Sequence, residues 1–194
     1  MTAAGLSGGI DSSGWGTDNP HMNRLVLVIV ILCSSAVSTA EEHIQVAFVE
    51  TTCASKNQFL EASNEIKQQK TVMQRNANHL KIFGNSLRFN DWVGYIDAID
   101  VVGSTNIHLA VRLPCGIHLE TWNNTISDMA HKTLIPFDSV VGGFLEESHV
   151  GQKVLFSGYF FPGEGGGVYE QSFTTRGSMI DPEFLVRFTE ILNF

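Results

Sequence analysis

The stretch from Asn90 to the end of the chain constrains the fold most, because short β-like runs there are separated by turn signals, as in all-β domains. Residues 107–113 form the clearest run, with apolar and polar side chains alternating between the two faces of a strand. Similar runs at 91–102 and 117–122 predict a three-stranded meander. The rest of the predicted order is a short helix at 139–148, a strand at 153–161, a glycine-rich connection at 162–167, a strand at 168–174 and a final strand or short helix at 184–191.

Three strands, a helix and two further strands is the element order of the OB-fold. We therefore predict a mainly β protein with an N-terminal helix and a five-stranded Greek-key OB-fold barrel. Two segments, Trp92–Ile96 and Val154–Phe160, resemble the first and fourth strands of small exported bacterial OB-fold proteins, a mostly uncharacterised group related to anticodon-binding-like barrels. Thr121–Asn124 and Ser178–Phe184 add to this resemblance, which covers about residues 90–191. The resemblance implies a fold and no particular activity, since this barrel hosts unrelated ligands.

The first forty residues predict export. Arg24 precedes an apolar run at 25–37 and the small residues 38–40, which is the build of a signal peptide cleaved after Ala40. A transmembrane anchor is the less favoured alternative, because a span needs about 20 apolar residues. We expect a periplasmic or secreted protein with no stable membrane span after cleavage. The predicted divisions are a leader or start extension at 1–21, a signal peptide at 22–40, a segment with an amphipathic helix at 41–84 and an OB-fold domain at 85–194.

The leader contains one motif that needs separate treatment. Ser7–Ser12 matches the phosphate-binding loop of ATP pyrophosphatases as a string. That loop needs a strand before it and a helix after it, whereas only six residues precede this motif and Gly14, Gly16 and Pro20 break a following helix. We therefore interpret the match as coincidence.

Residues 55–83 carry apolar side chains three, four or seven apart, which predicts one amphipathic helix laid against the following domain. Ser55 and Gln58 can form a capping box at its start, and Gly84 favours its end. A coiled-coil dimer is poorly supported, because the repeat fails at Gln69–Lys70.

Two cysteines, Cys53 and Cys115, remain once the predicted signal peptide is removed. In an oxidising compartment such a pair predicts a disulfide, with two buried free thiols as the alternative. A metal site would need more thiol or imidazole ligands at short spacing.

The outer face of strands two and three is the usual ligand surface of an OB-fold. An aromatic and cationic platform on this face could stack a sugar or base, or anchor a peptide. An ordinary solvated sheet face, partly covered by the N-terminal helix, is the alternative, and a covering helix would prevent binding. The predicted platform consists of His108, Arg112, His118, Glu120 and Trp122, flanked by Tyr95 and Tyr159.

Other polar groupings are better explained by structure than by chemistry. His118–Glu120 has the H-x-E spacing of zinc deaminases, but no C-x-x-C follows it. Gly163–Gly167 lacks the strand-to-helix context of a phosphate loop. A cluster after the third strand could share a metal ion, but we favour turn and cap roles for its members Asn123, Asn124, Asp128 and His131. We predict no cofactor and no metal.

These observations favour a non-catalytic exported binding module that recognises a protein, a peptide or an envelope glycan, and they leave its oligomeric state open. A single-stranded nucleic-acid-binding protein is the alternative that the predicted fold encourages. The net charge of -8 disfavours it, because phosphate backbones attract basic proteins. A third hypothesis is a hydrolase that uses Glu120 or Asp128 with a nearby histidine.

Overall fold

A computed structural model describes residues 20–163 and 166–194, with side chains from residue 41 onward. Contacts divide the chain into two units, Met1–Ala36 and Val37–Phe194. Helix α1 begins in the first unit, and the second unit contains the rest of α1, α2 and the sheet. The Ser7–Ser12 motif lies outside the described residues. Within the described part of the chain, no helix is both long and apolar enough to cross a membrane.

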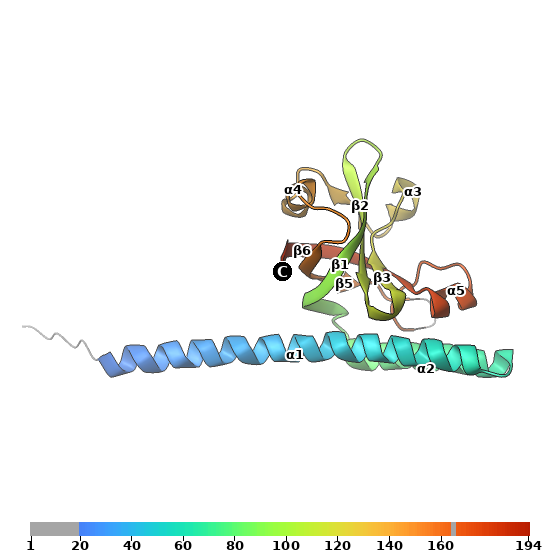
Figure 1. The fold of residues 1–194 in the computed structure, drawn as a ribbon, viewed down its shortest axis with the longest axis horizontal. Helices are drawn as coiled ribbons and strands as arrows, with labels where there is room; N and C mark the ends of the chain where they lie inside the picture. Colours follow the sequence, from blue (N-terminus) through green and yellow to red (C-terminus); the bar gives the residue numbers. More distant parts are fainter. Residues whose placement is uncertain (1–19, 164–165) are drawn as a thin grey trace, which may run out of the picture. The chain divides into compact units, whose positions relative to one another are not determined.

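Two helices precede the sheet, α1 (Pro20–Glu61) and α2 (Glu65–Phe83) (Figure 1). The prediction of one helix over 55–83 is therefore wrong, because the chain turns at residues 62–64. Asn64 adopts an extended backbone and its side chain accepts a hydrogen bond from the Lys67 backbone N–H, so Asn64 starts α2 as an N-cap. Ser55 lies buried within α1 and caps no helix. Gly84 ends α2 at a φ of 59°, as predicted.

Six strands follow the helices and form one mixed sheet. The strand order is β1-β5-β6-β3-β2-β4, and β1 also pairs with β2, so that five of the strands form a near-ring. The β3–β6 pairing is parallel and the other pairings are antiparallel. The strands are β1 (Arg88–Val102), β2 (Asn106–Leu113), β3 (Ile117–Glu120), β4 (Ile135–Pro136), β5 (Lys153–Phe160) and β6 (Glu183–Asn193).

Short helices connect the strands. They are the 3-10 turn η1 (Pro114–Gly116), α3 (Thr125–Asp128), α4 (Val140–Glu146) and α5 (Thr175–Ile180). The predicted meander, the helix near 139–148 and the strand near 153–161 are confirmed as β1 to β3, α4 and β5. The predicted strand at 168–174 is wrong, because this segment forms only isolated bridges before α5 begins. The C-terminal strand β6 is instead the fifth member of the near-ring.

The helices contribute an aromatic side chain to the core of the sheet. Phe48 of α1 is fully buried, and its ring centroid lies 5.4 Å from that of Trp92 in β1. The same ring lies 5.3 Å from Phe160 of β5 and 5.2 Å from Phe184 of β6. Phe83 of α2 joins the cluster at 5.5 Å from Phe48. Residues 37–61 of α1 therefore pack across one end of the near-ring and complete its core.

Candidate functional site

Four side chains form a row across neighbouring strands of the sheet. Tyr95 of β1 pairs in register with Arg112 of β2, and Arg112 pairs with His118 of β3. His118 in turn lies opposite Glu183 of β6. Directly paired residues share a face of the sheet, so the four side chains point to the same side. We call Tyr95, Arg112, His118 and Glu183 the row.

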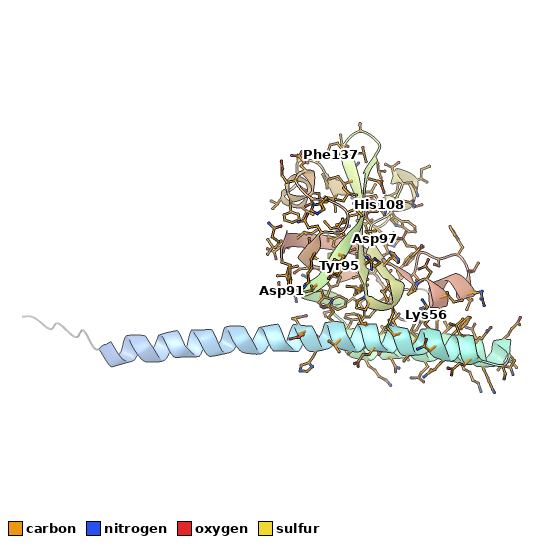
Figure 2. The ribbon with its side chains drawn as sticks, in the orientation of Figure 1. Lys56, Asp91, Tyr95, Asp97, His108 and Phe137 are labelled. Carbon is orange, nitrogen blue, oxygen red and sulfur yellow. A yellow bond between two sulfur atoms is a disulfide. The ribbon has the colours of Figure 1, made fainter. Side chains whose placement is uncertain are left out.

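Polar contacts join two members of the row, Arg112 and His118, to Asp97 and Asp181. The Oδ1 atom of Asp97 lies 3.0 Å from Arg112 Nε, and Asp97 Oδ2 lies 3.4 Å from His118 Nδ1. His118 Nε2 lies 3.8 Å from Asp181 Oδ1, and the Asp181 side chain is 68% exposed. Asp97 sits where the register of β1 with β2 shifts between Ile96 and Ala98, and such a bulge re-aims a side chain. Figure 2 shows Tyr95 and Asp97 on β1 and His108 on β2.

Two titratable groups lie deeper beside the row. Burial, together with the negative charges of Glu183, Asp181 and Asp97, raises the pKa of Glu120 to about 7. His108 is buried, with Nδ1 at 3.2 Å from Thr121 Oγ1 and Nε2 at 3.9 Å from Glu120 Oε2. Burial lowers the pKa of His108. His108 is therefore a buried neighbour of Glu120 and not an exposed platform residue.

A mainly apolar groove of about 400 Å³ adjoins the Tyr95 end of the row, between α1 and strands β1 and β2. The groove exists because β1 pairs with β2 only from Tyr95 onward. The residues of β1 before Tyr95 pair with β5 instead. Val46 and Tyr95 are 45% and 44% exposed along it. The lining residues are Gln45, Val46, Val49, Glu50, Val93, Gly94, Tyr95, Arg112, Leu113 and Pro114.

Side chains and backbone build this groove closely. The Gln45 side chain donates to the Val93 carbonyl at 2.6 Å and accepts from the Val93 N–H at 3.0 Å. Gln45 therefore satisfies the backbone N–H and carbonyl of Val93, at a point where β1 no longer pairs with β2. Behind the groove, a Cβ atom at Gly94 would lie 2.6 Å from Val111 Cγ1 and 3.1 Å from Phe156 Cε1, so glycine lets β1 pack closely against the core at this point.

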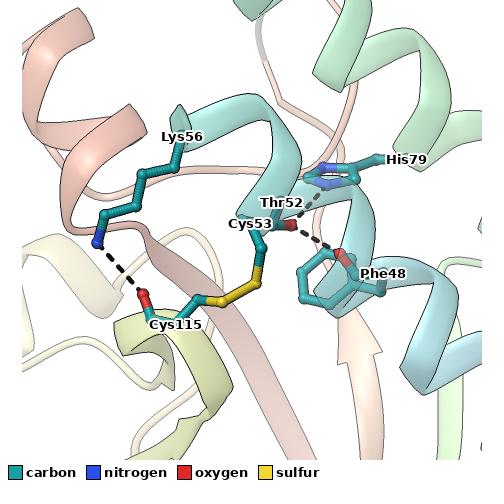
Figure 3. Close-up of a disulfide and its surroundings, with 6 residues drawn as sticks. All are labelled: Phe48, Thr52, Cys53, Lys56, His79 and Cys115. Carbon is teal, nitrogen blue, oxygen red and sulfur yellow. Dashed lines mark hydrogen bonds between the residues drawn. A yellow bond between two sulfur atoms is a disulfide. The ribbon is translucent and has the colours of Figure 1, made fainter. Parts of the chain in front are cut away.

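The disulfide holds the wall of the groove in place. Cys53 of α1 is bonded to Cys115 of η1, as the sequence predicts (Figure 3). Lys56 Nζ donates to the Cys115 carbonyl at 3.3 Å. On the other side of α1, Thr52 Oγ1 lies 3.0 Å from Nε2 of the buried His79. Helix α1 thus forms one wall of the groove. The side chains of Arg112 and Asp181 remain accessible to solvent, at 49% and 68% exposure.

The remaining predicted platform residues belong to a different cluster. The Trp122 indole Nε1 lies 3.3 Å from His131 Nδ1, and the Trp122 and Tyr169 ring centroids are 5.9 Å apart. Tyr159 packs at 5.5 Å from Phe161. Trp122 follows the end of β3 at Glu120, so strand alternation no longer sets its direction. The structure therefore brings together Tyr95, Arg112, His118 and Glu120, but not Trp122 and Tyr159.

Two members of the polar cluster after β3, Asn124 and Asp128, have cap and turn roles. Asn124 accepts a hydrogen bond from the Ser127 N–H at 2.8 Å as the N-cap of α3. Asp128 accepts from the Thr133 hydroxyl at 2.7 Å and from the Leu134 N–H at 3.3 Å. Among the residues that the structure describes, no group of three or more His, Cys, Asp and Glu side chains is placed to hold a metal ion.

Sequence reasoning missed a buried ion pair behind the row. Arg75 Nη2 of α2 lies 3.4 Å from Glu170 Oε2, and Arg75 Nη1 donates to the Ser178 carbonyl at 2.6 Å. Glu170 Oε1 accepts from the Glu183 N–H at 2.6 Å. Burial raises the pKa of Glu170, and the neighbouring Arg75 opposes this rise. Because both groups are bonded to backbone from distant segments, the pair ties α2 to the segment that precedes β6.

Comparisons with protein-family models, with curated proteins and with solved structures found no match to this chain. The groove, the row and their charges are the observations that support the function proposed below.

Proposed function

We propose that this chain is a non-catalytic, exported binding module that recognises an extended segment of a protein or peptide at the groove and the row. The observation that carries the proposal is the continuity of an apolar groove with a row of open polar side chains. A pocket of several hundred Å³ with apolar walls and a few polar groups is the usual form of a recognition site.

The dimensions favour an extended ligand. The row crosses three strand spacings of about 4.8 Å each, roughly 14 Å in all. An extended peptide of about four residues covers that length at roughly 3.4 Å per residue. Such a peptide could place an apolar side chain between Val46 and Tyr95 and set its next residues over Arg112 and His118.

The fold and the compartment are part of the same proposal. Five strands in a near-ring with one parallel pair, β3–β6, support an OB-fold barrel, which is a five-stranded Greek-key structure. The Cys53–Cys115 disulfide supports an oxidising compartment, because disulfides persist outside the reducing cytosol. The signal-peptide pattern at 22–40 supports export to the periplasm or the medium.

Selection of displayed random peptides tests the proposal. The native protein should enrich peptides that lose at least tenfold in affinity on Val46→Glu, because this change places a charge on the apolar wall. Val140→Glu is the matched control, since Val140 is 94% exposed on α4, away from the groove lining. Failure to select any peptide whose binding depends on Val46 would refute the proposal.

One observation favours a second candidate function, hydrolysis with Glu120 as general acid or base. A carboxyl group whose pKa is raised to about 7 suits proton transfer near neutral pH, and it has a histidine neighbour at 3.9 Å. This candidate predicts turnover of a peptide or glycoside substrate that disappears in Glu120→Gln. Unchanged turnover in this variant would exclude Glu120 as the acid or base.

A further inference from the structure

Negative charge exceeds positive charge around the groove and the row. Arg112 of the row has its Nε 3.0 Å from Asp97, and Lys153 of β5, which pairs with Tyr95, has its Nζ 3.3 Å from the Phe194 ring centroid. Lys56 contacts the Cys115 carbonyl nearby. The acidic groups of this surface are Glu50 in the groove, Glu183 in the row, Asp97 and Asp181 in contact with the row, and the less exposed Glu120 on the same face of β3 as His118.

These carboxylates are close enough to act on one another. Asp97, Asp181 and Glu183 all raise the pKa of Glu120, so their fields overlap at that point. The Asp181 carboxylate lies 3.8 Å from His118 Nε2, and its side chain remains 68% exposed. A cation placed over Asp97 and Asp181 would therefore relieve repulsion between carboxylates and form ion pairs of its own.

From this charge pattern we propose that the partner segment is basic: an extended peptide that buries an apolar side chain in the groove and pairs adjacent Lys or Arg side chains with Asp97 and Asp181. The inference rests on the proposed function and specifies the chemistry of its partner. An extended peptide suits both parts of the surface, because one apolar side chain can enter the groove while the long, flexible stems of the neighbouring Lys or Arg side chains carry their charges along the surface to the carboxylates.

Charge also distinguishes a basic peptide from the other molecules that could bind such a surface. An acidic peptide or a phosphate backbone would meet the carboxylates of Asp97, Asp181 and Glu183. A second copy of this chain carries a net charge of -8 of its own, so pairing of two such surfaces is repulsive. A basic segment with spaced apolar residues is the one partner that complements both the groove and the carboxylates.

Three synthetic peptides test the inference with the full chain, by fluorescence anisotropy. The first is acetyl-Lys-Leu-Lys-Val-Lys-Leu-Lys-amide. The second replaces every Lys with Glu, and the third replaces Leu and Val with Ser. We expect the first to bind at least tenfold more tightly than either of the others, since it alone carries both complementary features. Its affinity should fall several-fold between about 50 and 300 mM salt, because exposed charges are screened.

Two double variants distinguish contacts with Asp97 and Asp181 from attraction to the overall negative charge of the protein. Asp97→Asn combined with Asp181→Asn should weaken binding of the Lys-Leu peptide about tenfold, as expected for two partly exposed ion pairs. Glu146→Gln combined with Glu147→Gln removes the same charge at exposed positions at the end of α4 and should leave affinity unchanged. Thermal melting of each variant checks that the fold is retained.

Each outcome has a defined meaning. Equal weakening by both charge pairs, or equal affinity for the Lys-Ser peptide, would overturn the inference in favour of non-specific attraction. Tight binding of the Glu peptide, or selected peptides without basic residues that still depend on Val46, would overturn the inference while the proposed function stands. Absence of any Val46-dependent peptide would refute the proposed function itself.

Discussion

Replacing Glu120 with Gln should change how the stability of the fold depends on pH. Burial and three neighbouring carboxylates raise the pKa of Glu120 from 4.5 to about 7. Between these two pH values the folded chain therefore holds a proton that the unfolded chain has already released. Stability falls as pH rises wherever the folded state binds more protons, so the ionised Glu120 lowers stability progressively through this window.

The size of the effect follows from the pKa change. A rise from 4.5 to about 7 corresponds to roughly 3 kcal/mol at about 1.4 kcal/mol per pKa unit. The Glu120 side chain is only 16% exposed, so solvent screening reduces this value little. Glutamine keeps the shape of the side chain without the charge. Among the described residues, the Glu120 carboxyl group forms no hydrogen bond that glutamine would break, and its Oε2 lies 3.9 Å from His108 Nε2.

Urea denaturation at about pH 5 and about pH 8 measures the difference. The native chain should lose about 2 to 3 kcal/mol more stability than Glu120→Gln between these pH values. Burial lowers the pKa of His79 to about 3, so His79 makes stability rise with pH between about 3 and 6.5, but it does so in both proteins and cancels. Identical pH dependence in the native chain and in Glu120→Gln would refute this account of Glu120.

Three further predictions concern the helices and the charge. Replacing Cys53 and Cys115 with Ser should cost about 4 kcal/mol by the chain-entropy relation for a separation of 62 residues, measured by urea denaturation, and two free thiols in the denatured, unreduced protein after export and removal of residues 1–40 would contradict the bridge. Phe48→Ala should destabilise the fold by about 3 to 5 kcal/mol, whereas Leu60→Ala, at a 52% exposed position of the same helix, should cost far less. A single-stranded oligonucleotide should show no measurable binding even at low salt, and binding that weakens steeply with salt would revive the nucleic-acid alternative.

Strands β1, β2, β3 and β5 and half of the candidate site could be predicted from local patterns. The alternation of residues 107–113 gave the direction of each β2 side chain, and with it the exposed position of Arg112. The pattern of 117–122 did the same for His118 and Glu120, but not for Trp122, since β3 ends at Glu120. Alternation describes a residue only while the strand continues.

Features that depend on distant partners could not be predicted in this way. The apolar spacing of 55–83 suits one long helix, and the turn at Asn64 becomes necessary only because Phe48 and Phe83 both pack into the same core. The pairing of Arg75 with Glu170 joins segments that no local pattern relates. Asp97 contributes to the row through a bulge, which is a property of two strands and not of one.

The position of Phe48 also bears on when the domain can finish folding. Its ring packs against Phe184, so the first helix of the domain and its last strand meet in one cluster. The parallel pair of β3 with β6 adds another contact between distant parts of the chain. Such non-local contacts slow folding, because loops must close before the contacts form. During synthesis the core therefore stays open until β6 leaves the ribosome, and a chain truncated before Glu183 would expose the aromatic rings that Phe48 joins.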